Sequence, residues 1–140
     1  MGTWGIGIFQ NDDAMDWLEE YRSFGVSAVA DALYEPLEAE ENGFIEAPEG
    51  ARGLAAAEAV ANAFYQPDEE FDAEILENLS AFQQQIMALP RVVSAAQRAV
   101  AAISDQAEVS ELLSLWEEQD KGAAFLKVAA GLQARLGKAQ

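Results

Sequence analysis

The sequence predicts an all-α protein: a single domain over residues 1–140, built from six or seven short helices and preceded by an extended, glycine-rich N-terminal segment. Two observations support this fold class. Apolar residues recur with i, i+3, i+4, i+7 spacing along most of the chain, which is typical of helices with one buried face. The alternation of apolar and polar residues that indicates β-strands is nearly absent. A chain of 140 residues is also long enough to form its own hydrophobic core.

The N-terminal segment places glycines between large apolar residues. Glycine allows close approach of the backbone, and burial of one large side chain is worth about 1.5–3 kcal/mol. We therefore expect Trp4, either Ile6 or Ile8, and Phe9 to anchor this segment in the core.

The first helix is predicted over residues 12–24. Asn11 or Asp12 is expected to be its N-cap, because a short polar side chain accepts a hydrogen bond from a free amide of the first turn. Asp12 and Asp13 also place negative charge where the helix dipole favours it. Gly25 is expected to end the helix.

A second helix follows directly, and Pro36 is expected to end or kink it, because proline lacks the amide hydrogen and clashes with the preceding turn. The acidic residues after the proline are expected to lead into a turn at Asn42 and Gly43. Phe44 and Ile45 are interpreted as an apolar anchor under this loop.

Two helices are predicted in the middle of the chain. The first spans residues 48–65 and is nearly all alanine between residues 54 and 63, so that neighbouring helices can approach it closely. Pro67 and Asp68 are expected to separate it from an amphipathic helix over residues 71–89. The apolar stripe of this second helix consists of Ile75, Leu79, Phe82, Ile86 and Leu89.

Three more helices are predicted toward the C-terminus. Pro90 is expected to open the first of them. Ser110 or a nearby residue is expected to cap a short helix, and Asp120 is expected to cap the last helix, which ends at Gly137.

Composition excludes several classes of chemistry. The chain has no histidine and no cysteine, so Ser-His-Asp and Cys-His catalysis, zinc sites built on imidazole or thiolate, and Glu-x-x-His di-iron sites are ruled out. Eight basic residues without a basic stripe argue against binding nucleic acid through its phosphates. Carboxylate chemistry remains, and Asp12, Asp13, Asp16 and Glu58 are candidates to bind Mg²⁺ or to act as acid and base.

The Asn11-Asp12-Asp13 motif allows two interpretations, a helix cap or a ligand site. A calcium loop requires alternating acidic ligands and a glycine at its sixth position, but the sixth residue counted from Asn11 is Asp16. We therefore favour the cap, and we predict no catalytic, cofactor-binding or metal-binding residue and no cofactor.

Glu58 is unusual because it lies within the alanine-rich helix. A buried carboxylate must find hydrogen-bond partners or take up a proton. Three partners are considered: the indole NH of Trp4, a backbone amide of the glycine-rich segment, or an arginine. We favour such a structural role for Glu58.

The net charge of −17 is distributed unevenly along the chain. Residues 1–78 contain 19 acidic residues and two arginines, whereas residues 79–140 contain six acidic and six basic residues. The electrostatic field of this negative charge repels nucleic acid and anionic lipid and attracts a basic partner. The candidate acidic binding face consists of Asp16, Glu19, Glu20, Glu40 and Glu41.

The N-terminal residues form a specific motif, Trp-Gly-x-Gly-x-Phe-x-Asn-Asp-Asp-Ala. Its members are Trp4, Gly5, Gly7, Phe9, Asn11, Asp12, Asp13 and Ala14. Weaker similarities lie at Leu54, Ala55, Ala56, Ala57 and Glu58, and at Ser110, Glu111, Leu112, Leu115 and Trp116. On these residues the chain resembles an uncharacterised bacterial domain-of-unknown-function family, family 4259. The resemblance implies a small, mostly helical domain and brings no established activity and no known catalytic residues.

Three functions are compatible with these observations. The favoured hypothesis is a non-catalytic acidic module that binds a basic protein, such as an immunity-type inhibitor of a basic toxin or a regulatory protein. The alternatives are a structural module whose acidity only keeps it soluble, and an enzyme that uses carboxylates with or without a divalent metal. The lack of a signal-peptide pattern, of an apolar run of roughly 18–20 residues and of cysteine leads us to expect a cytoplasmic protein without a membrane partner. The oligomeric state is left open.

Overall fold

The structure, a computed structural model, describes residues 2–65 and 71–139. The described residues form one compact helical domain with two isolated β-bridges and no β-strand, which confirms the predicted all-α class. In chain order the elements are α1 (Asp12–Phe24), α2 (Val26–Glu41), α3 (Ala47–Phe64), α4 (Ala73–Leu79), the 3-10 turn η1 (Ser80–Phe82), α5 (Gln83–Ala88), α6 (Val92–Asp105), α7 (Glu111–Glu118) and α8 (Gly122–Lys138).

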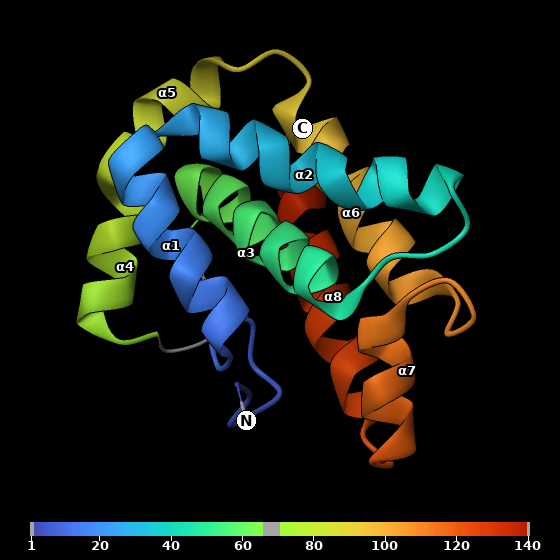
Figure 1. Ribbon diagram of the computed structural model, residues 1–140. Helices are drawn as coiled ribbons and strands as arrows, with labels where there is room; N and C mark the ends of the chain where they lie inside the picture. The colour runs from blue at the N-terminus through green and yellow to red at the C-terminus, as the bar shows by residue number, and fades with distance from the viewer. Residues whose placement is uncertain (1, 66–70, 140) are drawn as a thin grey trace.

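Helix α3 lies at the centre of the molecule (Figure 1). Helices α1, α2, α6 and α8 pack against it, and α2 also packs directly against α6. Every residue from 53 to 63 is buried, because the small side chains of this run let neighbouring helices approach on all sides. The closest approach is at Gly53, where an added Cβ would lie 2.8 Å from Ile103 Cδ1 and 3.0 Å from Pro36 Cγ.

The helix predicted over residues 12–24 is confirmed in both bounds. Asn11 is the N-cap, and its Oδ1 accepts a hydrogen bond from the Ala14 amide at 2.8 Å. Gly25 ends the helix with a positive φ of 69° that favours glycine.

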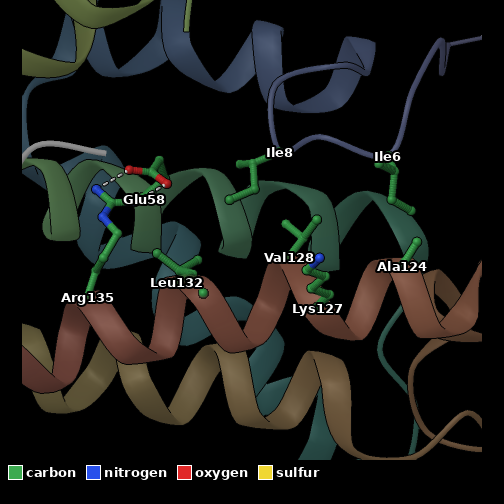
Figure 2. A pocket seen from close by; sticks show the side chains of 9 residues that line it. Ile6, Ile8, Glu58, Ala124, Lys127, Val128, Leu132 and Arg135 are labelled. Atoms are coloured by element: carbon green, nitrogen blue, oxygen red, sulfur yellow. Dashed lines mark hydrogen bonds and ion pairs between the residues drawn. The ribbon is translucent and has the colours of Figure 1, made fainter. Parts of the chain in front are cut away.

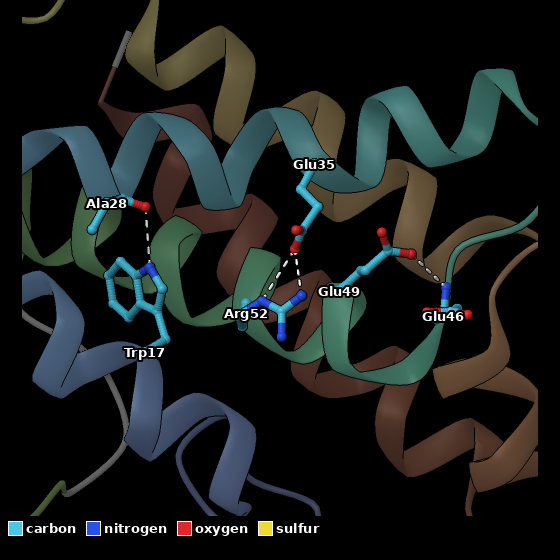
Figure 3. Close-up of polar contacts among 6 residues, drawn as sticks. All are labelled: Trp17, Ala28, Glu35, Glu46, Glu49 and Arg52. Carbon is cyan, nitrogen blue, oxygen red and sulfur yellow. Dashed lines mark hydrogen bonds and ion pairs between the residues drawn. The ribbon is translucent and has the colours of Figure 1, made fainter.

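Helix α1 is anchored to its neighbours by buried aromatic side chains. Trp17 and Tyr21 stack with their ring centroids 5.2 Å apart. The Trp17 indole also donates a hydrogen bond to the Ala28 carbonyl of α2 at 3.1 Å (Figure 3). This bond ties the two helices together on either side of the tight turn at Gly25.

The expectation that α2 ends at Pro36 is wrong, because the helix continues through the proline to Glu41. Pro36 is buried, and its ring packs against Gly53 of α3. This packing offsets the missing amide hydrogen bond, so the acidic residues placed in a loop by the sequence form the last turn of the helix. The predicted turn follows at Asn42 and Gly43. Of the predicted apolar anchor, Ile45 is fully buried whereas Phe44 is exposed.

Helix α3 begins at Ala47, one residue before the expected start. Glu46 and Glu49 form a capping box at its first turn, in which the Glu46 amide donates a hydrogen bond to Glu49 Oε1 at 2.9 Å (Figure 3). Pro67 and Asp68, which are expected to separate α3 from the next helix, lie outside the described residues.

The single helix predicted over residues 71–89 is wrong, because the structure has α4, η1 and α5 in its place. The break coincides with the hydroxyl of Tyr21, which donates to the Leu79 carbonyl at 3.0 Å and accepts from the Phe82 amide at 3.2 Å. A side chain inserted into the backbone hydrogen bonds is a known cause of a helix break. Of the predicted apolar stripe, Leu79 and Ile86 are buried and the other members are half-buried.

Two of the C-terminal boundaries also differ from the prediction. Pro90 does not open α6, because Arg91 adopts a left-handed conformation and the helix starts at Val92. Asp120 does not cap α8, since it has a φ of 58° and the cap position is Lys121.

Of two other predicted boundaries in this region, one is confirmed and one is wrong. Ser110 caps α7 as expected, accepting a hydrogen bond from the Leu113 amide at 3.3 Å. Gly137 does not end α8, which continues to Lys138.

Within the described ranges, no single helix has the length and apolar character required to cross a membrane. The segments Ala73–Ala88 and Val92–Asp105 have the required length and apolar character only when they are taken together, and they are bent by 119° relative to each other.

Candidate functional site

The N-terminal residues 2–11, here called the glycine loop, fold back on themselves instead of forming the expected extended segment. Thr3 forms an antiparallel bridge with Asn11, and the Trp4 amide donates to the Gln10 carbonyl at 3.0 Å. The Gln10 side chain fills the centre of the loop, where its Oε1 accepts from the Gly7 amide at 2.9 Å. A Cβ at Gly5 would lie 2.2 Å from the same oxygen, so a side chain there would displace the Gln10 amide.

The expectation that Trp4 anchors the loop in the core is wrong, because its side chain is 60% exposed. Ile8 and Phe9 are the buried residues of the loop, and Ile6 is half-buried. Phe9 packs edge-on against Phe71 with ring centroids 5.6 Å apart. The reversal of the chain turns Trp4 away from the core.

The acidic motif after the loop has the geometry of a helix start. Asn11 is the cap, and Asp12 and Asp13 occupy the first turn of α1. Across the part of the chain that the structure describes, no three histidine, cysteine, aspartate or glutamate side chains are grouped so that they could hold a metal ion. The hydrogen bond from the Ala14 amide to Asn11 Oδ1 confirms that Asn11 caps α1.

Glu58 of α3 is paired with Arg135 of α8 inside the protein. Arg135 Nη1 donates to Glu58 Oε1 at 2.7 Å, and Nη2 lies 2.7 Å from Oε2 (Figure 2). The two residues are only 2% and 6% exposed. Arg135 Nη2 also donates to the Tyr65 carbonyl at 3.3 Å. Of the three partners considered for Glu58, the arginine is the one that the structure shows.

Sequence reasoning did not identify Arg135, although one signal was available. Arg135 lies three residues after Leu132, where the i, i+3 spacing of the apolar stripe places it on the buried side of α8. An arginine at such a position requires a buried acceptor, and Glu58 was the carboxylate already expected to need a partner.

A pocket of about 340 Å³ lies beside this ion pair, between the glycine loop and α8. Figure 2 shows Ile6 and Ile8 entering it from the loop, with side chains of α8 on the opposite wall. Glu58 and Arg135 close one end, and Lys127 also lines the pocket. The structure thus brings Glu58 close to the loop of the sequence motif.

The predicted acidic face contributes to two separate hollows. Asp16, Glu19 and Glu20 are exposed on α1, and Glu40 and Glu41 are exposed in the last turn of α2. Glu20 lines a hollow of about 360 Å³ formed by residues of α1, α2 and α3. Glu40 lines a different hollow, of about 470 Å³, formed mainly with α6.

The hollow at Glu20 also contains Asp31, Glu35 and Arg52. Arg52 Nη2 lies 2.6 Å from Glu35 Oε1, and Arg52 Nε donates to the same oxygen at 3.1 Å (Figure 3). Glu20 and Asp31 form no ion pair within the described residues. The hollow therefore carries uncompensated negative charge.

Helix α2 presents an exposed stripe, here called the α2 stripe, of which the predicted acidic face included only Glu41. Its members are Asp31, Tyr34, Glu38 and Glu41, and all four are exposed. Their i, i+3, i+7, i+10 spacing is the signal that could have identified them. Tyr34 is 50% exposed and lies along the helix between Asp31 and Glu38.

Exposed aromatic side chains are confined to the acidic part of the chain. Among the described residues, these are Trp4, Phe24, Tyr34, Phe44 and Tyr65. In residues 79–140, where the numbers of acidic and basic residues are equal, the exposed large apolar residues are not aromatic; they are Met87, Leu115 and Leu126. Acidic charge and exposed aromatic surface thus occur together.

Comparison with known proteins identifies a family. The family model described as Domain of unknown function (DUF4259) matches residues 2–127, which include the glycine loop, Glu58 and Lys127. No curated protein and no solved structure matches the chain.

Proposed function

The chain belongs to the DUF4259 family, and we propose that it functions as a non-catalytic acidic module that binds a basic protein. The observation that carries the proposal is the α2 stripe, in which exposed Tyr34 lies one helical turn from Asp31 and from Glu38, with Glu41 in the turn after Glu38. An inhibitor of a basic toxin and a regulatory subunit are two forms that such a module takes.

The chemistry of the stripe suits a protein partner. Tyrosine is enriched at the centres of protein interfaces, because it supplies a large, rigid contact area together with a polar hydroxyl. Carboxylates around such an anchor increase the rate of encounter with a basic partner and discriminate against acidic ones. A nucleic acid or an anionic membrane would be repelled by the same surface.

Few basic residues neutralise this surface from within the protein. The arginines of residues 1–78 are Arg22 and Arg52. Arg52 is paired with Glu35, and Arg22 donates to the side-chain oxygen of Asn78. The carboxylates of the α2 stripe form no ion pair within the described ranges, so they are available to a partner. We place this function in the bacterial cytoplasm, where disulfides are rare; the chain has no cysteine with which to form one.

The experiment is affinity capture from a lysate of the native host, with elution by increasing salt. We expect the wild-type protein to capture a basic protein that elutes as salt screens the charges. In the α2 variant, Asp31→Lys, Glu38→Lys and Glu41→Lys are combined, and capture should be lost.

A control variant combines Glu108→Lys, Glu117→Lys and Glu118→Lys. These residues are exposed and lie within residues 79–140, where acidic and basic residues are equal in number. It makes the same change in net charge and should retain the partner. Equal capture by both variants, or the absence of a basic protein, would leave a structural module whose acidity serves solubility. Copurification of a divalent metal or a metabolite would favour the enzyme alternative.

A further inference from the structure

We propose that the pocket between the glycine loop and α8 binds a small aliphatic monocarboxylate, with its apolar tail inside the pocket and its carboxylate at Lys127. This site is separate from the α2 stripe, and the inference does not depend on the proposed protein partner.

The walls of the pocket are suited to an apolar tail. Ile6 and Ile8 descend from the glycine loop, and Val128 and Leu132 face them from α8 (Figure 2). The volume of about 340 Å³ lies at the lower end of the range typical of small-molecule sites, about 300–1,000 Å³. The pocket therefore has room for a short chain and not for a large cofactor.

Gly131 keeps this space open. A glycine within a helix costs roughly 0.5–1 kcal/mol relative to alanine, so its presence in the middle of α8 calls for a reason. Its φ is not positive, and a Cβ built on it would meet no atom within 4 Å. Neither backbone conformation nor close packing requires glycine at this position. What the missing side chain provides is the empty volume of the pocket that Gly131 lines.

The charges around the pocket favour an anion. Both carboxylate oxygens of Glu58 face guanidinium nitrogens of Arg135, so the pair contributes no net charge. Lys127 is exposed and forms no ion pair within the described residues. The pocket lining therefore carries one uncompensated positive charge in a protein whose net charge is −17.

Position along α8 assigns the two ends of the ligand. Lys127 lies one turn before Gly131, and Arg135 lies one turn after it. A carboxylate paired with the Lys127 ammonium leaves the tail to run over Gly131 and against Leu132, toward the closed end at the ion pair. This arrangement buries the tail and keeps the charged group at the solvent side.

Isothermal titration with octanoate as the probe tests the site. We expect saturable binding of octanoate to the wild-type protein and loss of binding in Gly131→Leu, where the new side chain fills the pocket. Gly137→Leu is the matched control, because Gly137 lies in the same helix and also has no atom within 4 Å of an added Cβ. Both substitutions replace glycine by a strong helix former, so both variants should fold at least as well as the wild type.

A second pair of measurements tests the anionic group. Lys127→Met should weaken octanoate binding about two- to fivefold, the range expected for an exposed ion pair, and should leave the affinity for octanol unchanged. Ala124→Met, which narrows the pocket from another position, should weaken binding of both probes. Absence of saturable binding to the wild type, or wild-type affinity in Gly131→Leu, would overturn the proposal. Equal losses of octanoate and octanol binding in Lys127→Met would overturn the assignment of the carboxylate.

Discussion

At the scale of single residues, Glu58 and Arg135 each depend on the other to compensate a buried charge. Truncating one partner of a buried ion pair leaves the other charge without compensation and costs about 3–5 kcal/mol. We therefore expect Arg135→Met and Glu58→Leu to lower the free energy of unfolding by that amount. The double variant should be more stable than either single variant, because an apolar pair of similar volume leaves no buried charge.

Urea unfolding of the four proteins in a double-mutant cycle measures this coupling. The wild type supplies the reference value. Additive losses in the double variant would contradict the pairing seen between α3 and α8.

Tyr21 makes the stability of the protein depend on pH in the alkaline range. Burial raises the pKa of its hydroxyl above the ordinary value of 10.0, and the hydrogen bond from the Phe82 amide partly opposes this shift. The unfolded chain therefore loses this proton at a lower pH than the folded protein does. The contribution to stability is constant below pH 10.0 and decreases as the pH rises through and beyond that value.

Free energies of unfolding measured on both sides of this pH test the prediction. Tyr21→Phe should be less stable than the wild type at neutral pH, because two hydrogen bonds are lost, and should show a smaller alkaline decrease. Tyr34→Phe is the control, because it removes a tyrosine hydroxyl from an exposed position, and its stability at neutral pH should stay close to that of the wild type.

Of the two aromatic residues expected to anchor the glycine loop, Phe9 is buried and Trp4 is exposed. Trp4→Ala should change the free energy of unfolding by about 0.5 kcal/mol or less, as is typical of surface positions. Phe9→Ala, which removes a buried ring, should cost about 3–5 kcal/mol. Urea unfolding distinguishes the two variants, and a loss at Trp4 as large as that at Phe9 would contradict the exposed position of the indole.

At the scale of elements, the boundary predictions that succeeded rest on local residues. Asn11, Gly25 and Ser110 act on the backbone within a few residues of themselves; Gly25 was predicted to end α1, and Asn11 and Ser110 were among the residues predicted as caps. The break after α4 depends on Tyr21, which is 58 residues distant from Leu79 along the chain. No periodicity within residues 71–89 contains that information.

The same distinction applies to Pro36 and to the candidate site. A proline inside a helix is unfavourable locally, but the close packing of the Pro36 ring against Gly53 makes it acceptable in the folded protein. The sequence identified the glycine loop and the need of Glu58 for a partner. It did not identify the pocket, because the pocket exists only where the loop and α8, more than 100 positions apart, lie together.

Two glycines in helices should respond in opposite ways to the addition of one methyl group. At Gly53 a Cβ would contact the rigid ring of Pro36, so Gly53→Ala should destabilise the protein by about 1–3 kcal/mol. At Gly131 nothing lies within 4 Å, so Gly131→Ala should stabilise it by about 0.5–1 kcal/mol through helix propensity. Thermal and urea unfolding provide the measurement. A gain in stability at Gly53 would show that α2 and α6 can move away from α3.

At the scale of the whole molecule, the uneven charge has consequences for the fold as well as for binding. Exposed like charges repel one another, and dissolved salt screens them over about 8–10 Å at ordinary ionic strength. We therefore expect the melting temperature to increase when sodium chloride is added. The α2 variant should show a smaller increase than the variant changed at Glu108, Glu117 and Glu118, although both have the same net charge. Equal salt dependence would indicate that the repulsion is spread evenly over the molecule.

The hydroxyl of Tyr21 also has a consequence for local opening of the native state. Its two hydrogen bonds attach the backbone between α4 and α5 to α1, so the amide of Phe82 loses its acceptor whenever α1 moves away. Residues 73–88 and α1 should therefore open as one cooperative unit, and their amides should exchange with solvent deuterium at a common free energy. In Tyr21→Phe the two segments are uncoupled, and Phe82 should exchange faster than the amides of α1.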